Sequence, residues 1–246
     1  MDSFQHYLDK SNKATSVEDL VTTLLLEVKK YGYDRMIFCL LSDHSHIGLS
    51  AGVGYLNNYP ENWMKYYLDN GFDKIDPVIS YCRQKVGSFT WDEMSSNLNL
   101  TKKQKTCLNL GREAELLNGV CTPLWGPQRF AGVGLASSND KDATDSRPAT
   151  LDHITALCNH FYLVFQRQHD GTTLNNDNLE NVFLTPKEYE VLTWAARGKS
   201  NNDIGDILGI SDSTVNFHLR QIYKKLQVHD RVVACTKAIS LGLIFP

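Results

Sequence analysis

The segment from Tyr59 to Asp76 combines aromatic side chains with a carboxylate at spacings that suit the binding of a small molecule. Trp63 and Tyr67 lie one helical turn apart, so a helix would place both rings on one face. Asp76 precedes Pro77, which biases Asp76 toward an extended backbone. Aromatic walls with polar ring tips and one carboxylate suit a small, mostly apolar amide or ester ligand. The same pattern also fits an ordinary core in which the rings find protein partners and Asp76 caps a helix.

A second set of polar side chains lies near the C-terminus, on a predicted helix with one apolar face. The apolar face comprises Val215, Leu219, Ile222 and Leu226. The opposite face carries Ser213, Asn216, Arg220 and Lys224. Asn and Arg form paired hydrogen bonds with adenine and guanine edges, and no acidic residue lies between Ser213 and Gln227 to repel phosphate. Lys199 and Ser200 lie at a predicted helix N-terminus, which can hold a phosphate. An ordinary solvated helix face would look similar.

Four successive helix signals predict the element that carries this face. Thr185 and Glu188 form a capping-box pattern, with Pro186 at the first helical position. The later helices are predicted to start at Ser200 with Asp203, at Ser211 and at Asp230. The predicted helix ends are Gly198, Gly209 and Gly242. A short helix, a tight glycine turn and a longer helix are typical of a helix-turn-helix. We therefore predict an all-α four-helix helix-turn-helix domain over 184–246.

The N-terminal part mixes helix and strand signals. Ser16 and Asp19 predict a capped helix with an apolar stripe, and 61–71 and 150–168 predict two more helices. Predicted strands cover 36–41 and 130–138. The order predicts an α+β fold, an α/β/α sandwich, as a ligand-binding domain over 1–168. Residues 169–183 are rich in Asn, Asp and Thr and are predicted to be a linker.

Composition limits the function classes. The net charge of −3 means that DNA binding must rest on local charge placement. The chain start is not a signal peptide and no apolar run reaches the roughly 18 residues of a membrane span, so we expect a cytoplasmic protein without a membrane partner. The six cysteines are scattered without a CxxC pair, which favours reduced thiols and no metal. There is no GxSxG and no metal-ligand spacing of histidines, so we expect neither an enzyme nor a cofactor.

Both halves of the chain resemble the LuxR-type quorum-sensing transcription regulators that bind N-acyl-homoserine lactones. The C-terminal resemblance rests on Glu188, Leu192, Gly198 and the run TVNFH at 214–218. The N-terminal resemblance rests on Trp63, Tyr67, Asp76, Pro77, Trp91 and Gly119. It implies that the chain binds an acyl-homoserine lactone and, as a homodimer, a palindromic operator in double-stranded DNA. A regulator that responds to a different small molecule, or that works without a ligand, remains the alternative.

The resemblance also implies roles for single residues. The Trp63 indole would donate to the lactone carbonyl, the Asp76 carboxylate would accept the amide N–H, and the Tyr59 hydroxyl would donate to the acyl carbonyl. Trp91 would pack against the lactone ring, and Tyr67 would line the acyl side. The expected ligand site also includes Val78, Cys121 and Leu135.

For DNA, the resemblance implies that Asn216 and Arg220 reach bases. Lys199, Thr214 and Lys224 would contact phosphate or support the helix. The 150–168 helix would contribute to a parallel homodimer contact, although its stripe also suits packing inside its own domain. Whether the ligand promotes or releases DNA binding, and whether promoters are activated or repressed, does not follow from the sequence.

Three departures from the family pattern bear on the length of the acyl chain that the site can bind. Met64 replaces an Arg, Cys39 replaces a Gly of some long-chain receptors, and Leu135 replaces a hydroxyl residue. These larger apolar side chains predict a short-to-medium acyl group. Glu115 stands where a small residue is usual, and the sequence offers no account of it.

Overall fold

The computed structural model describes residues 3–44, 47–126, 129–139, 144–170 and 182–246, and it divides the chain into two compact units. The units are Met1–Leu174 and Asn175–Pro246. Most of the predicted linker lies outside the described residues. In the described part of the chain, no helix is long and apolar enough to cross a membrane.

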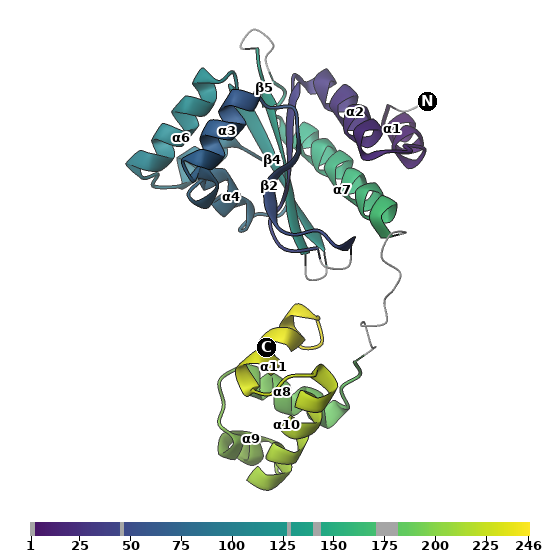
Figure 1. Cartoon of the computed structure of the whole chain (residues 1–246), viewed down its shortest axis with the longest axis vertical. Helices are drawn as coiled ribbons and strands as arrows, with labels where there is room; N and C mark the ends of the chain where they lie inside the picture. The colour runs from purple at the N-terminus through teal and green to yellow at the C-terminus, as the bar shows by residue number, and fades with distance from the viewer. Residues whose placement is uncertain (1–2, 45–46, 127–128, 140–143, 171–181) are drawn as a thin grey trace. The chain divides into compact units, whose positions relative to one another are not determined.

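The first unit is built on a five-stranded sheet with the strand order β2-β1-β5-β4-β3 (Figure 1). The strands are β1 (Arg35–Leu40), β2 (Gly52–Asn57), β3 (Phe89–Thr90), β4 (Asn118–Gly126) and β5 (Arg129–Ser137). All neighbouring strands are antiparallel. The predicted strands 36–41 and 130–138 are confirmed as β1 and β5, which are neighbours at the centre of the sheet. β2, β3 and β4 were not predicted.

Helices cover both faces of the sheet, as the predicted sandwich requires (Figure 1). One face carries α1 (Ser3–Asn12), α2 (Val17–Val28) and α7 (Pro148–Asp170). The other carries α3 (Glu61–Asp69), α4 (Pro77–Cys82), α5 (Trp91–Asn97) and α6 (Lys102–Glu113), with a short 3-10 turn, η3 (Phe72–Lys74), after α3. The predicted cap of α2 is present, since the Ser16 side chain accepts from the Asp19 backbone N–H.

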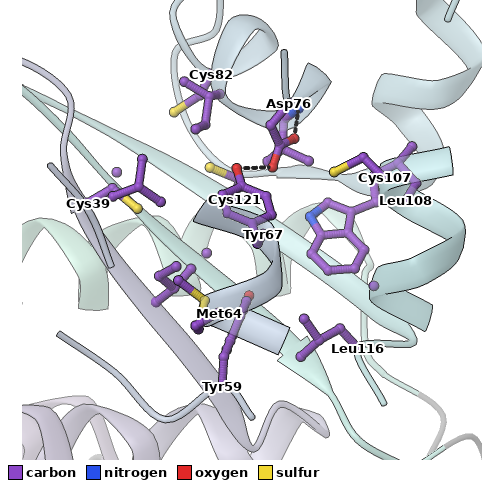
Figure 2. Close-up of a pocket in the computed structure, with 18 of the residues that line it drawn as sticks. Cys39, Tyr59, Met64, Tyr67, Asp76, Cys82, Cys107, Leu108, Leu116 and Cys121 are labelled. Atoms are coloured by element: carbon purple, nitrogen blue, oxygen red, sulfur yellow. Dashed lines mark hydrogen bonds between the residues drawn. The ribbon is translucent and has the colours of Figure 1, made fainter. Parts of the chain in front are cut away.

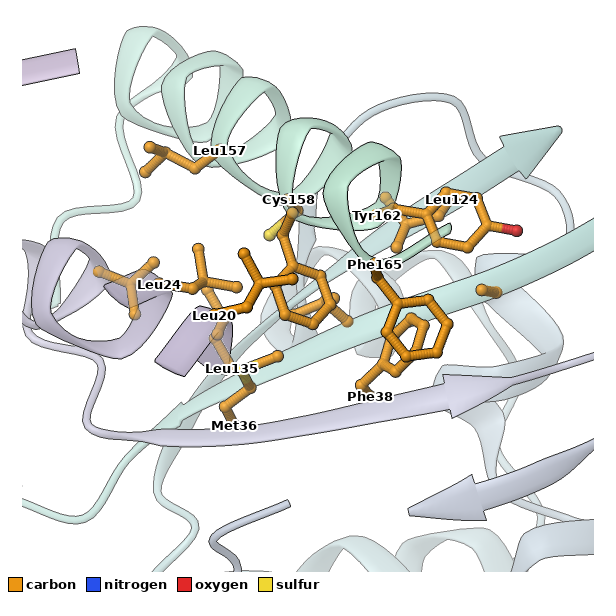
Figure 3. Packing of buried hydrophobic residues seen from close by; sticks show 14 of the residues in the cluster. Leu20, Leu24, Met36, Phe38, Leu124, Leu135, Leu157, Cys158, Tyr162 and Phe165 are labelled. Carbon is orange, nitrogen blue, oxygen red and sulfur yellow. The ribbon is translucent and has the colours of Figure 1, made fainter. Parts of the chain in front are cut away.

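The main core lies between the sheet and α7 (Figure 3). Phe38 of β1 packs edge-on against Phe161 and Phe165 of α7, with ring centroids 5.3 and 4.9 Å apart. Ile154 and Cys158 of the same stripe are also fully buried. The apolar stripe of 150–168 therefore packs inside its own domain, which settles one alternative that the sequence left open. Any contact between copies of α7 must use other residues of the helix.

The second unit has the four predicted helices, α8 (Pro186–Ala196), α9 (Asn201–Leu208), α10 (Asp212–Leu226) and α11 (Arg231–Ser240). Each begins at the predicted cap, because the side chains of Thr185, Ser200, Ser211 and Asp230 accept from backbone N–H groups of the first turn. A Cβ on Gly205 would lie 2.7 Å from the Ile210 carbonyl oxygen, so glycine permits the tight turn between α9 and α10. The core includes Val191, Ile204, Val215, Leu219 and Ile222, all buried.

Candidate functional site

A cavity of about 90 Å³ lies between the sheet and the helices α3, α4 and α6 (Figure 2). Of the eight residues predicted to line a ligand site, seven line this cavity. They are Tyr59, Trp63, Tyr67, Asp76, Val78, Trp91 and Cys121. The fold therefore brings together residues on or next to α3, α4, α5 and β4 that the sequence spreads over more than sixty positions.

The eighth residue, Leu135, was wrongly predicted to line the site. It is fully buried in the core on the α7 face of the sheet. Successive side chains of a strand point to opposite faces, so Val133 and Leu135 of β5 face α7 while Gly132 and Gly134 face the cavity. The replacement of a hydroxyl residue by Leu135 therefore does not change the wall of the cavity.

The two glycines of β5 form the floor of the cavity. A Cβ on Gly134 would lie 2.8 Å from Cγ2 of Ile37 and 3.5 Å from the Tyr59 hydroxyl oxygen. A Cβ on Gly132 would lie 3.3 Å from Sγ of Cys82. Side chains at these two positions would fill the space that the cavity occupies.

The α3 helix provides the aromatic wall. Trp63 and Tyr67 are buried on one face of α3, with ring centroids 5.7 Å apart, and Trp63 stacks on Phe72 at 6.4 Å. Tyr59, just before α3, is buried beside them. Burial raises the pKa of both tyrosines, so their hydroxyls are protonated and available as donors.

Asp76 both caps a helix and lines the cavity. One carboxylate oxygen, Oδ1, accepts the Val78 backbone N–H at 2.8 Å at the start of α4. The other, Oδ2, accepts the Tyr67 hydroxyl at 2.8 Å (Figure 2). Burial raises the pKa of the carboxyl above its usual value, against the lowering effect of these two hydrogen bonds. Each oxygen of a carboxylate accepts more than one hydrogen bond, so Asp76 keeps acceptor capacity for a ligand donor.

Trp91 closes another side of the cavity from the first turn of α5. The Thr90 side chain caps that helix by accepting from the Glu93 N–H at 2.9 Å. A Cβ on Gly119 would lie 2.1 Å from Cε2 of Trp91, so only glycine on β4 leaves room for the indole. Within the described residues, the buried Nε1–H of Trp91 has no hydrogen-bond acceptor.

Several lining residues were not predicted as ligand contacts. They include Ile37, Cys39, Met64, Cys82, Cys107, Leu108, Gly111 and Leu116. Three of them lie on α6, a helix that was missed although its capping box of Thr101 and Gln104 is readable in the sequence. Cys39 and Met64 had been noted only as departures from the family pattern.

Glu115 has a backbone φ of 62°, in the left-handed region that favours glycine. The preference of this backbone conformation for glycine accounts for the small residue expected at position 115 from the family resemblance. The Glu115 side chain lies 3.9 Å from the Arg35 guanidinium.

The helix α10 carries the predicted DNA face in the second unit. Val215, Leu219, Ile222 and Leu226 are buried. The predicted polar residues on the other side are exposed, namely Ser213, Asn216, Arg220 and Lys224. Lys199 and Ser200 are exposed at the start of α9, where Arg231 donates to the Lys199 carbonyl and, at 2.7 Å, to Asn201 Oδ1. Thr214 is half-buried in the first turn of α10 and bonds the Ser211 hydroxyl.

Phe217 was missed as a member of this face. It follows Ser213 by one turn and precedes Arg220 by one turn, so all three lie on one side of α10. Its side chain is 57% exposed, which is unusual for a phenyl ring on an otherwise polar helix face.

Comparison with known proteins matches both units. Residues 16–165 match the family model of the autoinducer binding domain, and residues 182–238 match that of the luxR family of bacterial regulatory proteins. No cluster of metal-ligating side chains is present among the residues described.

Two relatives and one solved structure illustrate the similarity. The HTH-type transcriptional regulator y4qH of Sinorhizobium fredii is 31% identical over 83% of this chain, but only 61% of that protein is covered. The transcriptional activator protein LuxR of Aliivibrio fischeri is 29% identical over 96% of this chain and 92% of its own length. The crystal structure of Escherichia coli SdiA has a TM-score of 0.61 at 23% identity and covers 100% of both chains, which shows a shared fold.

The raised pKa of Asp76 predicts a pH dependence of the stability of the ligand-free protein. The unfolded carboxyl titrates near 3.8, whereas the folded one titrates higher, so unfolding releases a proton in the window between the two values. The free energy of unfolding contributed by Asp76 therefore falls as pH rises through this window. We expect the stability of the wild type relative to Asp76→Asn to decrease across it, measured by urea unfolding at a series of pH values.

The matched control is Asp69→Asn, at the exposed end of α3. The difference in free energy of unfolding between the wild type and Asp69→Asn should not show the fall with pH that is expected for Asp76→Asn. A pH-independent difference for Asp76→Asn would show that its carboxyl is not desolvated in the folded chain.

Proposed function

The chain belongs to the LuxR family of autoinducer-binding transcription regulators, and we propose that its ligand is an N-acyl-homoserine lactone. The observation that carries the proposal is the Asp76 carboxylate in the wall of an aromatic cavity, held by two donors and able to accept a third. An amide N–H of the ligand would supply that third hydrogen bond. A hydrogen bond to a charged group contributes roughly 1.5–3 kcal/mol, more than one between neutral groups.

The remaining ligand contacts in this proposal are those that the family resemblance implies. The Trp63 indole N–H donates to the lactone carbonyl, and the Tyr59 hydroxyl donates to the acyl carbonyl. Trp91 packs against the lactone ring. Tyr67 acts differently from the sequence-based expectation, because its hydroxyl is already directed at Asp76 and positions that carboxylate.

The acyl group in this proposal is short to medium in length. The cavity of about 90 Å³ is small, and the side chains of Met64 and Cys39 are part of its wall. Leu135 no longer supports this view, since it faces the opposite side of the sheet.

Co-purification tests the ligand class. The full chain is produced in cells given an equimolar panel of acyl-homoserine lactones from four to fourteen acyl carbons, and bound molecules are extracted for mass spectrometry. We expect retention of a member with a short or medium acyl group. Retention of chains of twelve or more carbons would contradict the length, and soluble protein carrying no panel member would contradict the ligand class.

Substitution tests the role of Asp76. We expect Asp76→Asn to weaken the response of a ligand-dependent reporter by about 10-fold or more, because an amide cannot give the charge-assisted acceptor. Val78 lines the cavity two residues after Asp76. Val78→Ala removes only apolar contact and should weaken the reporter response less. Equal responses of the two variants would contradict the assigned role, provided that immunoblots show equal amounts of protein.

We further propose that two copies of the chain bind a palindromic operator through α10. Recognition helices of such dimers lie about 34 Å apart, one turn of DNA. Asn216 and Arg220 contact base edges, with Ser213 beside them, while Lys199, Ser200, Thr214 and Lys224 contact phosphate or support the helix. Ligand bound by the folded N-terminal domain alone stabilises that domain and shifts the population of dimer geometries.

Phe217 adds an apolar contact to this interface. An exposed phenyl ring between polar base-reading side chains suits the C5-methyl group of thymine, which is the apolar feature of the major groove. Phe217 therefore selects thymine at a position beside the base read by Arg220.

Operators selected from random duplexes test these contacts. Arg220→Ala should lose about 1–3 kcal/mol and relax the preference at its base pair. Replacing the thymine read by Phe217 with deoxyuridine removes only the methyl group and should weaken wild-type binding, but not further weaken Phe217→Ala. If both proteins lose the same affinity upon that replacement, Phe217 does not contact the methyl group.

A further inference from the structure

Four of the six cysteines line the cavity, a use of thiols that the proposed ligand contacts do not require (Figure 2). They are Cys39, Cys82, Cys107 and Cys121. The remaining two lie elsewhere, Cys158 on the core face of α7 and Cys235 in the second unit.

The strand register places two of these thiols on either side of the glycine floor. Cys39 of β1 pairs with Gly132, and Cys121 of β4 pairs with Gly134. Directly paired residues of antiparallel strands face the same side of the sheet. Both cysteines therefore border the floor of the cavity.

Cys82 approaches the glycine floor from α4, on the opposite side of the cavity from the sheet. It is the last residue of α4, and its Sγ lies 3.3 Å from the place of a Cβ on Gly132. The neighbouring Cys82 thiol, together with burial, raises the pKa of Cys121. Cys82 and Cys121 are 1% and 5% exposed and belong to one buried cluster, so two buried thiols lie next to each other in the cavity wall.

We propose that Cys82 and Cys121, the thiol pair, form a binding site for trivalent arsenic. Arsenous acid is small and uncharged, so it enters an apolar cavity without the desolvation cost of an ion. It also reacts with thiols that carry their protons. A zinc-type site does not fit, because it needs more ligands than two, and the described residues contain no metal-binding group of three.

The reaction needs no oxidant. As(OH)₃ exchanges two hydroxyl groups for the two sulfurs: two As–S bonds form, while two As–O bonds and two S–H bonds break. Each thiol proton leaves with a hydroxyl group as water. Arsenic stays in the trivalent state and keeps one hydroxyl group.

The thiol pair shares a cavity with the ligand assigned under the proposed function. Bound arsenic would occupy space in a cavity of about 90 Å³, so it would compete with the acyl group. This consequence rests on the proposed function, whereas arsenic binding itself does not.

Equilibrium dialysis of the reduced, ligand-free full chain against sodium arsenite tests the site, with bound arsenic measured by elemental mass spectrometry. We expect one tightly bound arsenic per chain. Cys82→Ala and Cys121→Ala should each weaken binding by about 100-fold, since chelation by two linked groups is lost. The matched controls are Cys107→Ala, in the same cavity, and Cys235→Ala, in the second unit; both should bind as the wild type does.

Arsenic K-edge absorption of the wild-type complex gives a readout that needs no variant. We expect two sulfur neighbours and one oxygen. Absence of arsenic uptake, an arsenic with only oxygen neighbours, or undiminished binding by the two thiol-pair variants would each overturn the proposal. Because no lactone is present, these outcomes are independent of the co-purification result.

Discussion

The two faces of β5 set the architecture of the first unit. Val133 and Leu135 point toward α7 and complete the main core, while Gly132 and Gly134 leave open space on the other side. Since the core face holds the sheet against α7, the strand stays in place although Gly132 and Gly134 contribute no side-chain packing on the other face. The cavity therefore depends on a core on the other side of the same strand.

Because one face of β5 packs in the core and the other carries two glycines, an otherwise packed domain retains a cavity. Aromatic rings pack against one another over the glycine face, as in the stacking of Trp63 on Phe72. A similar spatial demand operates at Gly119, where the absence of a side chain makes room for the Trp91 indole. Glycine thus shapes the cavity at three strand positions.

Asp76 shows how one side chain serves stability and binding together. Its hydrogen bonds to Val78 and Tyr67 fix the start of α4 and the direction of the carboxylate. The cost is desolvation, which raises the pKa of the carboxyl. A donor arriving from a ligand would offset part of that cost, and so binding and folding of this domain are coupled through one group.

Local signals in the sequence determined the second unit almost completely. Its caps at Thr185, Ser200, Ser211 and Asp230 act within one helical turn, and its apolar spacing alone selects the buried face of α10. The sequence also identified seven of the cavity-lining residues, through short spacings on α3 and α4 and through resemblance to a family. Only the tertiary structure assigned Leu135 to the core and brought Cys82 of α4 and Cys121 of β4 together in the cavity wall. Which face of a central strand a residue occupies depends on its register with neighbouring strands, and one of these, β1, lies almost a hundred residues earlier in the chain. A strand buried on both sides also lacks the polar alternation that would reveal its two faces.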